Sequence, residues 1–251
     1  MLSAARQGKG LVLFVDTFNG FFETENATDA VKVLQAAGYA VHVATQADGG
    51  ALCCGRTLLA AGLANEAKAR AQALLDALLP LADAGVCVVG LEPSCLLTLR
   101  DEMLVMGLGD GAHRLAAKAL LFEEFLAVEA AAGRFAPAWR VATQRILVHG
   151  HCHQKALGAM PPVMDVLRLI PGAAPELIES SCCGMAGSFG YEAAHFETSM
   201  QMAELSLLPA VRAAPDAIIV ADGTSCRHQI ADGAGRTALH VARVLADRLV
   251  G

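Results

Sequence analysis

Short apolar runs alternate along the first part of the chain with segments whose apolar residues recur at helical spacing. Residues 11–15, 39–44 and 86–91 are short, apolar and rich in β-branched side chains, which is typical of buried parallel strands. Helical stripes are predicted over residues 29–37, 66–81 and 96–103. Strands that alternate with helices in this order indicate βαβ units, and therefore a parallel sheet covered on both faces.

The same alternation begins again in the second part. Strands are predicted at 146–149, 176–179 and 217–220, and helices at 163–170, 189–208 and 240–250. A long helix over residues 115–132, ended by the Gly- and Pro-containing segment 133–137, separates the two series. We therefore expect an α/β protein of two similar halves, residues 1–135 and 136–251, each a small parallel sheet flanked by helices and related by a pseudo-two-fold axis.

Each half contains two adjacent cysteines followed by glycine. The doublets are Cys53-Cys54 and Cys182-Cys183. Adjacent cysteines do not easily form a disulfide with each other, because that bond requires Cα atoms about 5.5 Å apart. A following glycine lets the backbone approach a bulky inorganic group without a Cβ in the way. The doublets are therefore predicted to offer two ligands to one metal centre.

Internal duplication is supported by a second landmark. The doublets are separated by 129 residues (53 to 182), and Cys95 precedes Cys226 by 131 residues. Two offsets that agree within two residues indicate a repeated unit. The cysteines also follow predicted strands, and the carboxyl ends of parallel strands are where open α/β sheets bind their ligands.

The second half offers a complete set of thiolate ligands, made up of Cys152, Cys182, Cys183 and Cys226. Four thiolates can hold a 4Fe-4S cluster or a tetrahedral zinc ion. The alternative is that these are buried free cysteines packed as small apolar side chains. The recurrence of the doublet with its glycine favours the metal ligands.

The first half has a poorer set. Cys53, Cys54 and Cys95 are present, but Thr17 or Phe18 occupies the position of the remaining cysteine. The nearby Asp16 would complete a zinc shell more easily than a cluster, since carboxylates are hard ligands and cluster irons prefer thiolate. This site is predicted to be degenerate, three-coordinate with an open position, or empty.

Histidines and charged residues accompany both cysteine sets. His149, His151 and His153 flank the first cysteine of the second set, and His228 follows its last. A histidine in such a place can be a ligand, a hydrogen-bond donor to sulfur or a proton carrier, and for His151, His153 and His228 we expect a supporting role more than ligation. Beside the first set, Arg56 and Glu92 are either solvated loop residues or contacts for a substrate or anion.

Composition narrows the function classes. The 251 residues carry a net charge of −6, which argues against nucleic acid or an anionic membrane surface as partner. With 55% hydrophobic residues the chain still has no uncharged apolar run of membrane-spanning length, and its first residues do not form a secretory signal. We expect a cytoplasmic protein with reduced cysteines. The sequence has neither the ferredoxin-type cysteine run nor a G-x-G-x-x-G motif, so it is not expected to hold a flavin by itself.

These residues resemble the cysteine-rich CCG family, which includes the CCG-containing component of heterodisulfide reductase and the iron–sulfur component of glycolate oxidase. The resemblance covers nearly the whole chain. The segments LEPSC at 91–95, RDE at 100–102 and HGHCHQK at 149–155 are most similar to the C-terminal iron–sulfur region of fused FAD-linked dehydrogenases of D-2-hydroxy acids such as D-lactate or D-2-hydroxyglutarate. The resemblance implies an iron–sulfur electron-transfer module that receives electrons from FAD on a partner domain or subunit, with peripheral membrane association possible through a complex.

The sequence departs from the family's C-x-x-C element in both halves. Glu92 lies three residues before Cys95, and Gly223 lies three residues before Cys226. The second half keeps enough cysteines for a cubane 4Fe-4S cluster and too few for the non-cubane kind found in some members. Two alternatives remain open: a zinc-binding structural or assembly module without a redox role, and a site like that of heterodisulfide reductase with chemistry at the cysteine-ligated centre.

Overall fold

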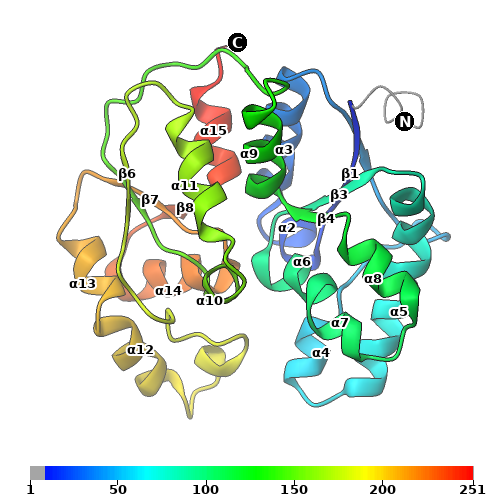
Figure 1. Ribbon diagram of the computed structural model, residues 1–251. Helices are drawn as coiled ribbons and strands as arrows, with labels where there is room; N and C mark the ends of the chain where they lie inside the picture. Colours follow the sequence, from blue (N-terminus) through cyan, green and yellow to red (C-terminus); the bar gives the residue numbers. More distant parts are fainter. Residues whose placement is uncertain (1–8, 251) are drawn as a thin grey trace. The chain divides into compact units, whose positions relative to one another are not determined.

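The computed structural model describes residues 9–250 as two compact units, the first ending at Pro137 and the second beginning at Ala138. Each unit contains a four-stranded, all-parallel sheet flanked by helices (Figure 1). The α/β class and the two similar halves expected from the sequence are confirmed. The pseudo-two-fold relation between the halves stays a prediction.

The first unit is built on four central strands and the helices that connect them. Its elements are β1 (Gly10–Phe14), α2 (Thr17–Phe21), α3 (Thr24–Ala36), β2 (Ala40–Val43), α4 (Arg56–Ala60), α5 (Ala64–Asp83), β3 (Cys87–Gly90), α6 (Pro93–Arg100), α7 (Glu102–Val105), α8 (Asp110–Ala116), β4 (Ala119–Leu121) and α9 (Phe122–Ala131).

The second unit repeats this plan with shorter strands. Its elements are β5 (Ile146–Val148), α10 (Cys152–Ala156), α11 (Met160–Arg168), β6 (Pro175–Leu177), the 3-10 helix η1 (Phe189–Tyr191), α12 (Phe196–Glu204), α13 (Leu207–Arg212), β7 (Ile218–Val220), α14 (Thr224–Ala234), β8 (Ala238–Leu239) and α15 (Val241–Arg248).

The two sheets have the same topology. The strand order is β2-β1-β3-β4 in the first and β6-β5-β7-β8 in the second. In both sheets, the second strand along the chain pairs with one edge of the first strand, and the third strand pairs with the opposite edge of the first. The loops after β1 and β3, and those after β5 and β7, therefore diverge at a switch point, which is where open α/β sheets bind ligands.

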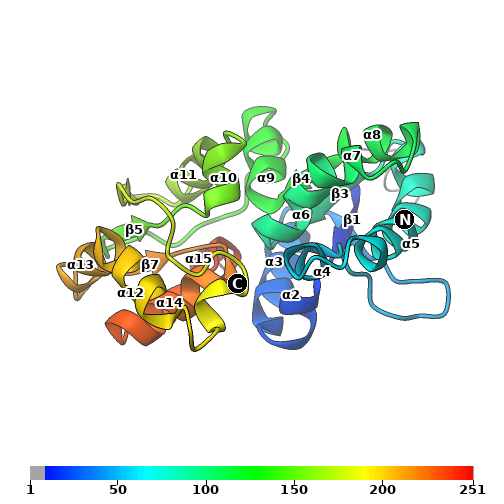
Figure 2. The same ribbon diagram turned by 90° about the horizontal axis from the view of Figure 1, so that it is seen from below.

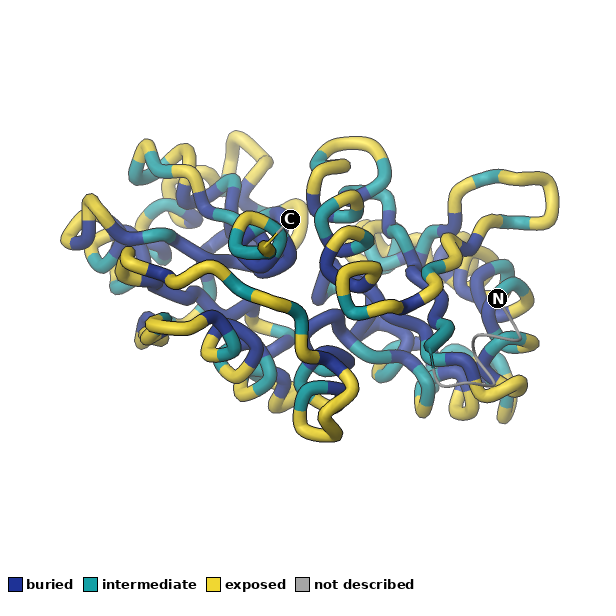
Figure 3. Tube along the Cα trace, turned by 90° about the horizontal axis from the view of Figure 1, so that it is seen from above, coloured by how far each residue is buried: buried dark blue, intermediate teal, exposed yellow. Residues whose placement is uncertain are grey.

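Helices cover both faces of each sheet because parallel crossovers are right-handed. In the second unit α12, α13 and α14 contact one another and lie together on one face, while α11 packs against α15 (Figures 1 and 2). In the first unit α5 and α6 both pack against α8. The central strands β1, β3, β5 and β7 are almost wholly buried, as the apolar runs predicted. Figure 3 shows buried segments inside each unit and exposed segments in the loops at its periphery.

The helix predicted over residues 115–132 is wrong. Residues 119–121 instead form β4, which pairs in parallel with β3, and α9 begins only at Phe122. Ala-Leu-Leu has a high intrinsic helix propensity, and the pairing with β3 overrides it. The carboxylate of Glu124 accepts a hydrogen bond from the Leu121 amide (2.9 Å), which fixes the start of the new helix.

The single helix predicted over residues 189–208 is also wrong. This segment contains η1, then an irregular stretch, then α12 and the start of α13. Gly190 explains the interruption, because a Cβ there would lie 2.5 Å from both the Met185 sulfur and the Ser199 hydroxyl. The chain turns at this glycine so that the loop holding the second cysteine doublet can fold against α12.

Among residues 9–250, no helix combines the length and the apolar character needed to cross a lipid bilayer.

Candidate metal centre

Three loops of the second unit bring its four predicted cysteines together. Cys152 is the first residue of α10 after β5, the doublet lies in the loop after β6, and Cys226 is in the first turn of α14 after β7. The Cys183 and Cys226 sulfurs are 3.4 Å apart, and Cys152 and Cys182 are hydrogen-bonded through their side chains. Cys182 and Cys183 are also hydrogen-bonded through their side chains, so the four sulfurs form one continuous cluster.

Backbone amides surround the sulfurs of the doublet. The Gly184 amide donates to the Cys182 sulfur at 3.3 Å, and the Ala186 amide is directed at the same atom. The Met185 amide is directed at Cys183. Successive amides that converge in this way make a concave anion site of the kind that holds iron–sulfur groups.

Gly184 is required by this loop geometry. Its φ of +95° lies in the left-handed region, and a Cβ would lie 2.1 Å from the backbone oxygen of Ser199. The glycine after the doublet therefore serves close packing of the loop against α12, in addition to any approach to a metal. Among the described residues, Ala186 is the one non-glycine residue with a positive φ, which is +42°.

The four thiols of the second unit differ in acidity. Hydrogen bonds with Cys152 and then Cys183 hold the pKa of Cys182 far below its usual range, and a hydrogen bond with Cys183 lowers the pKa of Cys226 against the effect of burial. The same hydrogen bonds, together with burial, raise the pKa values of Cys152 and Cys183. Thiolate is the form that binds metals, and the hydrogen bonds between the sulfurs favour it at Cys182 and Cys226.

A buried polar network fixes the position of α10. The Gln154 side-chain amide donates to Asp222 (2.9 Å) and its oxygen accepts from the His151 amide (3.1 Å). Asp222 also accepts from the Val241 amide (3.1 Å). Since Cys152 is the first residue of α10, these bonds set where its sulfur lies relative to the end of β7.

Two cations brace the loops that carry the other cysteines. Lys155 donates to the carbonyl oxygens of Ser180 (2.6 Å) and Ser181 (2.9 Å), which ties α10 to the segment just before the doublet. The buried Arg227 donates to the carbonyl oxygens at 221 and 222, both at 2.8 Å, and so holds the turn that precedes Cys226. Sequence reasoning missed both functions, because lysine and arginine side chains are usually exposed to solvent.

The histidines predicted beside the cluster occupy different surroundings. His151 caps α10, is buried, and places Nδ1 4.0 Å from the Cys152 sulfur. His153 packs edge-on against the His151 ring, and its amide is directed at Cys152. His228 instead has Nδ1 2.7 Å from the Tyr191 hydroxyl.

His149 lies beside two of the sulfurs, and the sequence left its role open between ligand, hydrogen-bond donor to sulfur and proton carrier. A nitrogen of His149 and the sulfurs of Cys183 and Cys226 all lie within 4.8 Å of one another, and all three residues are buried. Its Nδ1 lies 2.9 Å from the Ser180 hydroxyl, whereas Nε2 is buried and has no hydrogen-bond partner in the described chain. Its position directly after β5 and close to Cys152 was the signal in the sequence.

The first unit gathers its three cysteines in the same way. Cys53 and Cys54 are hydrogen-bonded to each other, and Cys54 to Cys95, which lies in the first turn of α6. The Gly55 and Arg56 amides donate to the doublet sulfurs at 3.5 and 3.4 Å. The polypeptide scaffold of the second site is therefore repeated with one fewer sulfur.

Oxygen atoms take the place of the missing sulfur. Thr17 is the first residue of α2, as Cys152 is of α10, and its side chain hydrogen-bonds Cys53. Asp16 caps α2 by accepting from the Phe18 and Asn19 amides, and burial followed by the charge of Glu92 raises its pKa.

Glu92 is buried, and it caps α6 by accepting from the Ser94 hydroxyl (2.8 Å) and amide. The Cys95 pKa is lowered by the hydrogen bond with Cys54, but burial and the carboxylates of Asp16 and Glu92 outweigh this and raise it to about 11. Arg56, for which the sequence left open a solvated position or a contact with a substrate or anion, forms an ion pair with Glu102 on α7.

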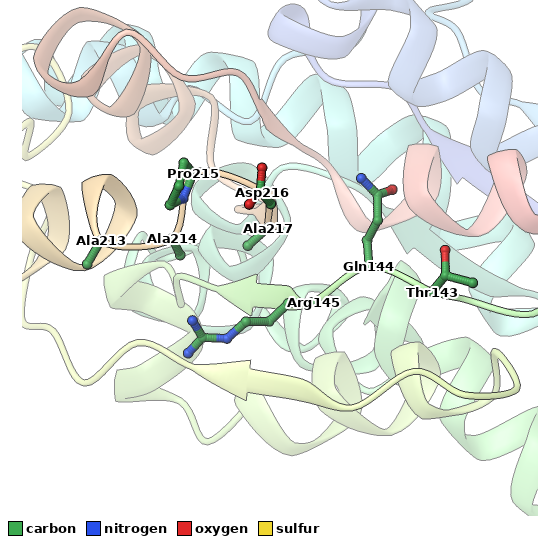
Figure 4. A pocket seen from close by; sticks show the side chains of 8 residues that line it. All are labelled: Thr143, Gln144, Arg145, Ala213, Ala214, Pro215, Asp216 and Ala217. Atoms are coloured by element: carbon green, nitrogen blue, oxygen red, sulfur yellow. The ribbon is translucent and has the colours of Figure 1, made fainter.

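A pocket of the second unit lies away from the cysteines (Figure 4). Its lining comes from residues 143–145, which precede β5, and residues 213–217, which precede β7. Arg145 in this pocket is paired with both carboxylate oxygens of Glu176 (2.7 and 2.6 Å). The pocket thus lies at the amino ends of strands whose carboxyl ends carry the cysteines.

The second site fits an iron–sulfur cluster. Four sulfurs converge, backbone amides are aimed at them, and a buried histidine nitrogen beside them has no partner in the described chain. A cluster would supply acceptors for those donors. The first site offers three thiols with raised pKa values and two buried carboxylates, a donor set that suits a single harder metal ion better than a cluster.

Comparison with known proteins gives one family and several relatives. The cysteine-rich domain family with the CCG motif matches residues 17–100 and again residues 146–231. The chain is 27% identical over 247 residues to D-2-hydroxyglutarate dehydrogenase of Escherichia coli K12, covering 98% of this chain and 23% of that protein. A Pseudomonas putida enzyme of the same name is 29% identical, covering 91% of this chain and 21% of the relative.

A second kind of relative is one component of a larger enzyme. The chain is 26% identical over 241 residues to a subunit of the anaerobic glycerol-3-phosphate dehydrogenase of Escherichia coli K12, covering 92% of this chain and 58% of that protein. The chain thus spans about a quarter of the D-2-hydroxyglutarate dehydrogenases and a little over half of the glycerol-3-phosphate dehydrogenase component that it matches.

Proposed function

The chain belongs to the family of cysteine-rich CCG domains, and from this we propose that it is an iron–sulfur electron-transfer module of a flavin-linked dehydrogenase. The relatives bear the names of dehydrogenases of D-2-hydroxyglutarate and glycerol-3-phosphate. Oxidation of such a hydroxylated acid or phosphate would take place on a flavin carried by a partner domain or subunit. Reduced thiols are a condition of this function, which suits the cytoplasm.

The observation that carries the proposal is the convergence of four sulfurs from three loops at the carboxyl end of one parallel sheet. Cys152, Cys182, Cys183 and Cys226 would hold the cluster. When bound, a 4Fe-4S cluster accepts and releases single electrons at a potential set by its hydrogen bonds and exposure.

The protein residues around the site have separable tasks in this function. The amides of residues 184–186 donate to the doublet sulfurs and so stabilise negative charge there. Lys155 and Arg227 hold the ligand loops in place. Cys152 is exposed whereas Cys183 and Cys226 are buried, which places one edge of the site at the surface of the unit, where a donor or acceptor can approach.

Metal analysis after anaerobic purification tests the proposal. We expect about four iron and four sulfide per chain, with no requirement for zinc in the second site. Zinc without iron would contradict the electron-transfer function and support the structural alternative.

A pair of serine variants assigns the site. Cys183→Ser should lose most of the iron and the visible thiolate-to-iron absorbance, whereas its counterpart Cys54→Ser should change little. The reverse outcome would place the cluster in the first unit. Any zinc that survives in Cys183→Ser and disappears in Cys54→Ser would assign a mononuclear metal to the first site, as its mixed thiol and carboxylate groups favour.

A further inference from the structure

His149 is a buried polar side chain that the four-cysteine ligand set does not use. It follows β5 directly and is 1% exposed. Its ring lies against the Cys183 and Cys226 sulfurs, with one nitrogen within 4.8 Å of both. A buried imidazole nitrogen without a hydrogen bond destabilises the fold, so its retention beside the sulfurs calls for a partner.

The hydrogen bonds of Ser180 determine which ring nitrogen carries the proton. The Ser180 hydroxyl is 2.9 Å from His149 Nδ1, and its oxygen also receives the Lys155 ammonium at 3.4 Å. The Ser180 hydroxyl has one other possible acceptor for its proton, the Ile178 carbonyl oxygen, which is more distant at 3.4 Å. The serine proton is therefore best placed on the bond to Nδ1, which leaves the imidazole proton on Nε2.

We propose that His149 donates a hydrogen bond from Nε2 to the thiolate sulfur of Cys226, and so raises the reduction potential of the centre that the four cysteines hold. This inference rests on the proposed function. Reduction adds negative charge to the cluster and its thiolates, and a donor aimed at a ligand sulfur stabilises the reduced form more than the oxidised form.

The first unit provides a natural contrast at the equivalent position. Val148 accepts through its carbonyl from the next strand at Ile178, and Leu13 does the same from Ala44. The residues that follow them, His149 and Phe14, therefore correspond, and both are 1% exposed. The fold accepts a buried aromatic hydrocarbon ring here, and the polar ring occurs in the unit that has the fourth cysteine.

His149→Phe is consequently the matched variant, because it keeps a buried ring and removes the donor. We expect it to retain the iron and sulfide of the wild type and to show a more negative midpoint potential in an anaerobic redox titration followed by electron paramagnetic resonance. His149→Gln, which keeps an N–H donor, should recover most of the shift. The exposed His113→Gln serves as a control and should leave the potential unchanged.

Ser180→Ala provides a second test that leaves His149 in place. Without the hydroxyl that fixes the ring tautomer, the potential should move in the same direction as in His149→Phe and by a smaller amount. This variant keeps the proposal testable should the phenylalanine disturb folding.

The outcomes separate this inference from the proposed function. Wild-type protein without an iron–sulfur cluster would overturn both. A wild-type cluster whose potential is the same in His149→Phe and Ser180→Ala would overturn the inference alone. Loss of iron in both His149 variants, accompanied by nitrogen hyperfine coupling in the wild-type spectrum, would make His149 a ligand and would likewise refute the hydrogen-bond assignment.

Discussion

Substitution of Gly184 by alanine tests whether the glycine of the CCG motif is required by the fold. A Cβ at this position would lie 2.1 Å from the Ser199 backbone oxygen and 3.0 Å from the Gln229 side-chain nitrogen. Gln229 itself donates to Ser199 at 3.0 Å, so the clash falls on a bond that joins α14 to α12. The contact with the Ser199 backbone oxygen cannot be relieved by rotating a side chain, and moving the Gln229 side chain would break its hydrogen bond to Ser199.

The expected loss of stability has two parts. A left-handed φ costs an L-residue about 1–2 kcal/mol, and overpacking of a buried site costs about 1–3 kcal/mol. We therefore expect Gly184→Ala to lower the free energy of unfolding of the second unit by about 2–5 kcal/mol. Gly187 in the same loop is the matched control, because its φ is +71° and nothing lies within 4 Å of a Cβ there. Gly187→Ala should cost about 1–2 kcal/mol, from the backbone alone.

Trp139 makes the measurement specific to the second unit. It is the single tryptophan of the chain, and it pairs with Leu249 in an antiparallel bridge. Its fluorescence in a denaturant titration reports the unfolding of the unit that carries Gly184, and iron analysis of the folded variants reports the ligand loop. Equal losses of stability in Gly184→Ala and Gly187→Ala would refute the steric argument.

Three further variants test other parts of the structure. Gly223→Cys, which would complete a C-x-x-C element, should destabilise the second unit by about 1–3 kcal/mol, because a Cβ there lies 2.4 Å from the His151 ring; adding His151→Ala should recover most of that loss in a double-mutant cycle. Asp222→Ala should cost about 1.5–3 kcal/mol per hydrogen bond in the same assay, since its carboxylate accepts two buried hydrogen bonds, and a smaller loss would mean that water replaces them. Burial and the hydrogen bond to Glu129 raise the pKa of Tyr39, so the stability that this residue gives the first unit is present below about pH 10 and is lost as the pH rises above it. Circular dichroism of denaturant unfolding should show that alkaline loss in the wild type and a smaller one in Tyr39→Phe.

The strands that could be predicted from the sequence are those marked by a run of apolar, β-branched residues within the strand itself. The β-branched apolar runs at 11–15, 86–91, 146–149 and 217–220 contain most or all of β1, β3, β5 and β7. The strands β4 and β8 escaped prediction, because they consist of two or three Ala and Leu residues that form strands only through pairing with β3 and β7. The intrinsic strand propensity of a residue does not show which distant strand it will pair with, so it could not predict β4 and β8.

The chemistry of the site follows from the sequence alone, which places four candidate ligand thiols in one half and three in the other, each after a strand and so directed to one edge of a sheet. The tertiary structure decided the surroundings of those thiols. In the folded chain Thr17 occupies the position that corresponds to Cys152, as the first residue of its helix. The His151 ring fills the space that a Cβ of residue 223 would need, and His149 lies beside the sulfurs of Cys183 and Cys226. These relations join loops that are far apart along the chain, and their energies depend on packing and burial that no local stretch of sequence encodes.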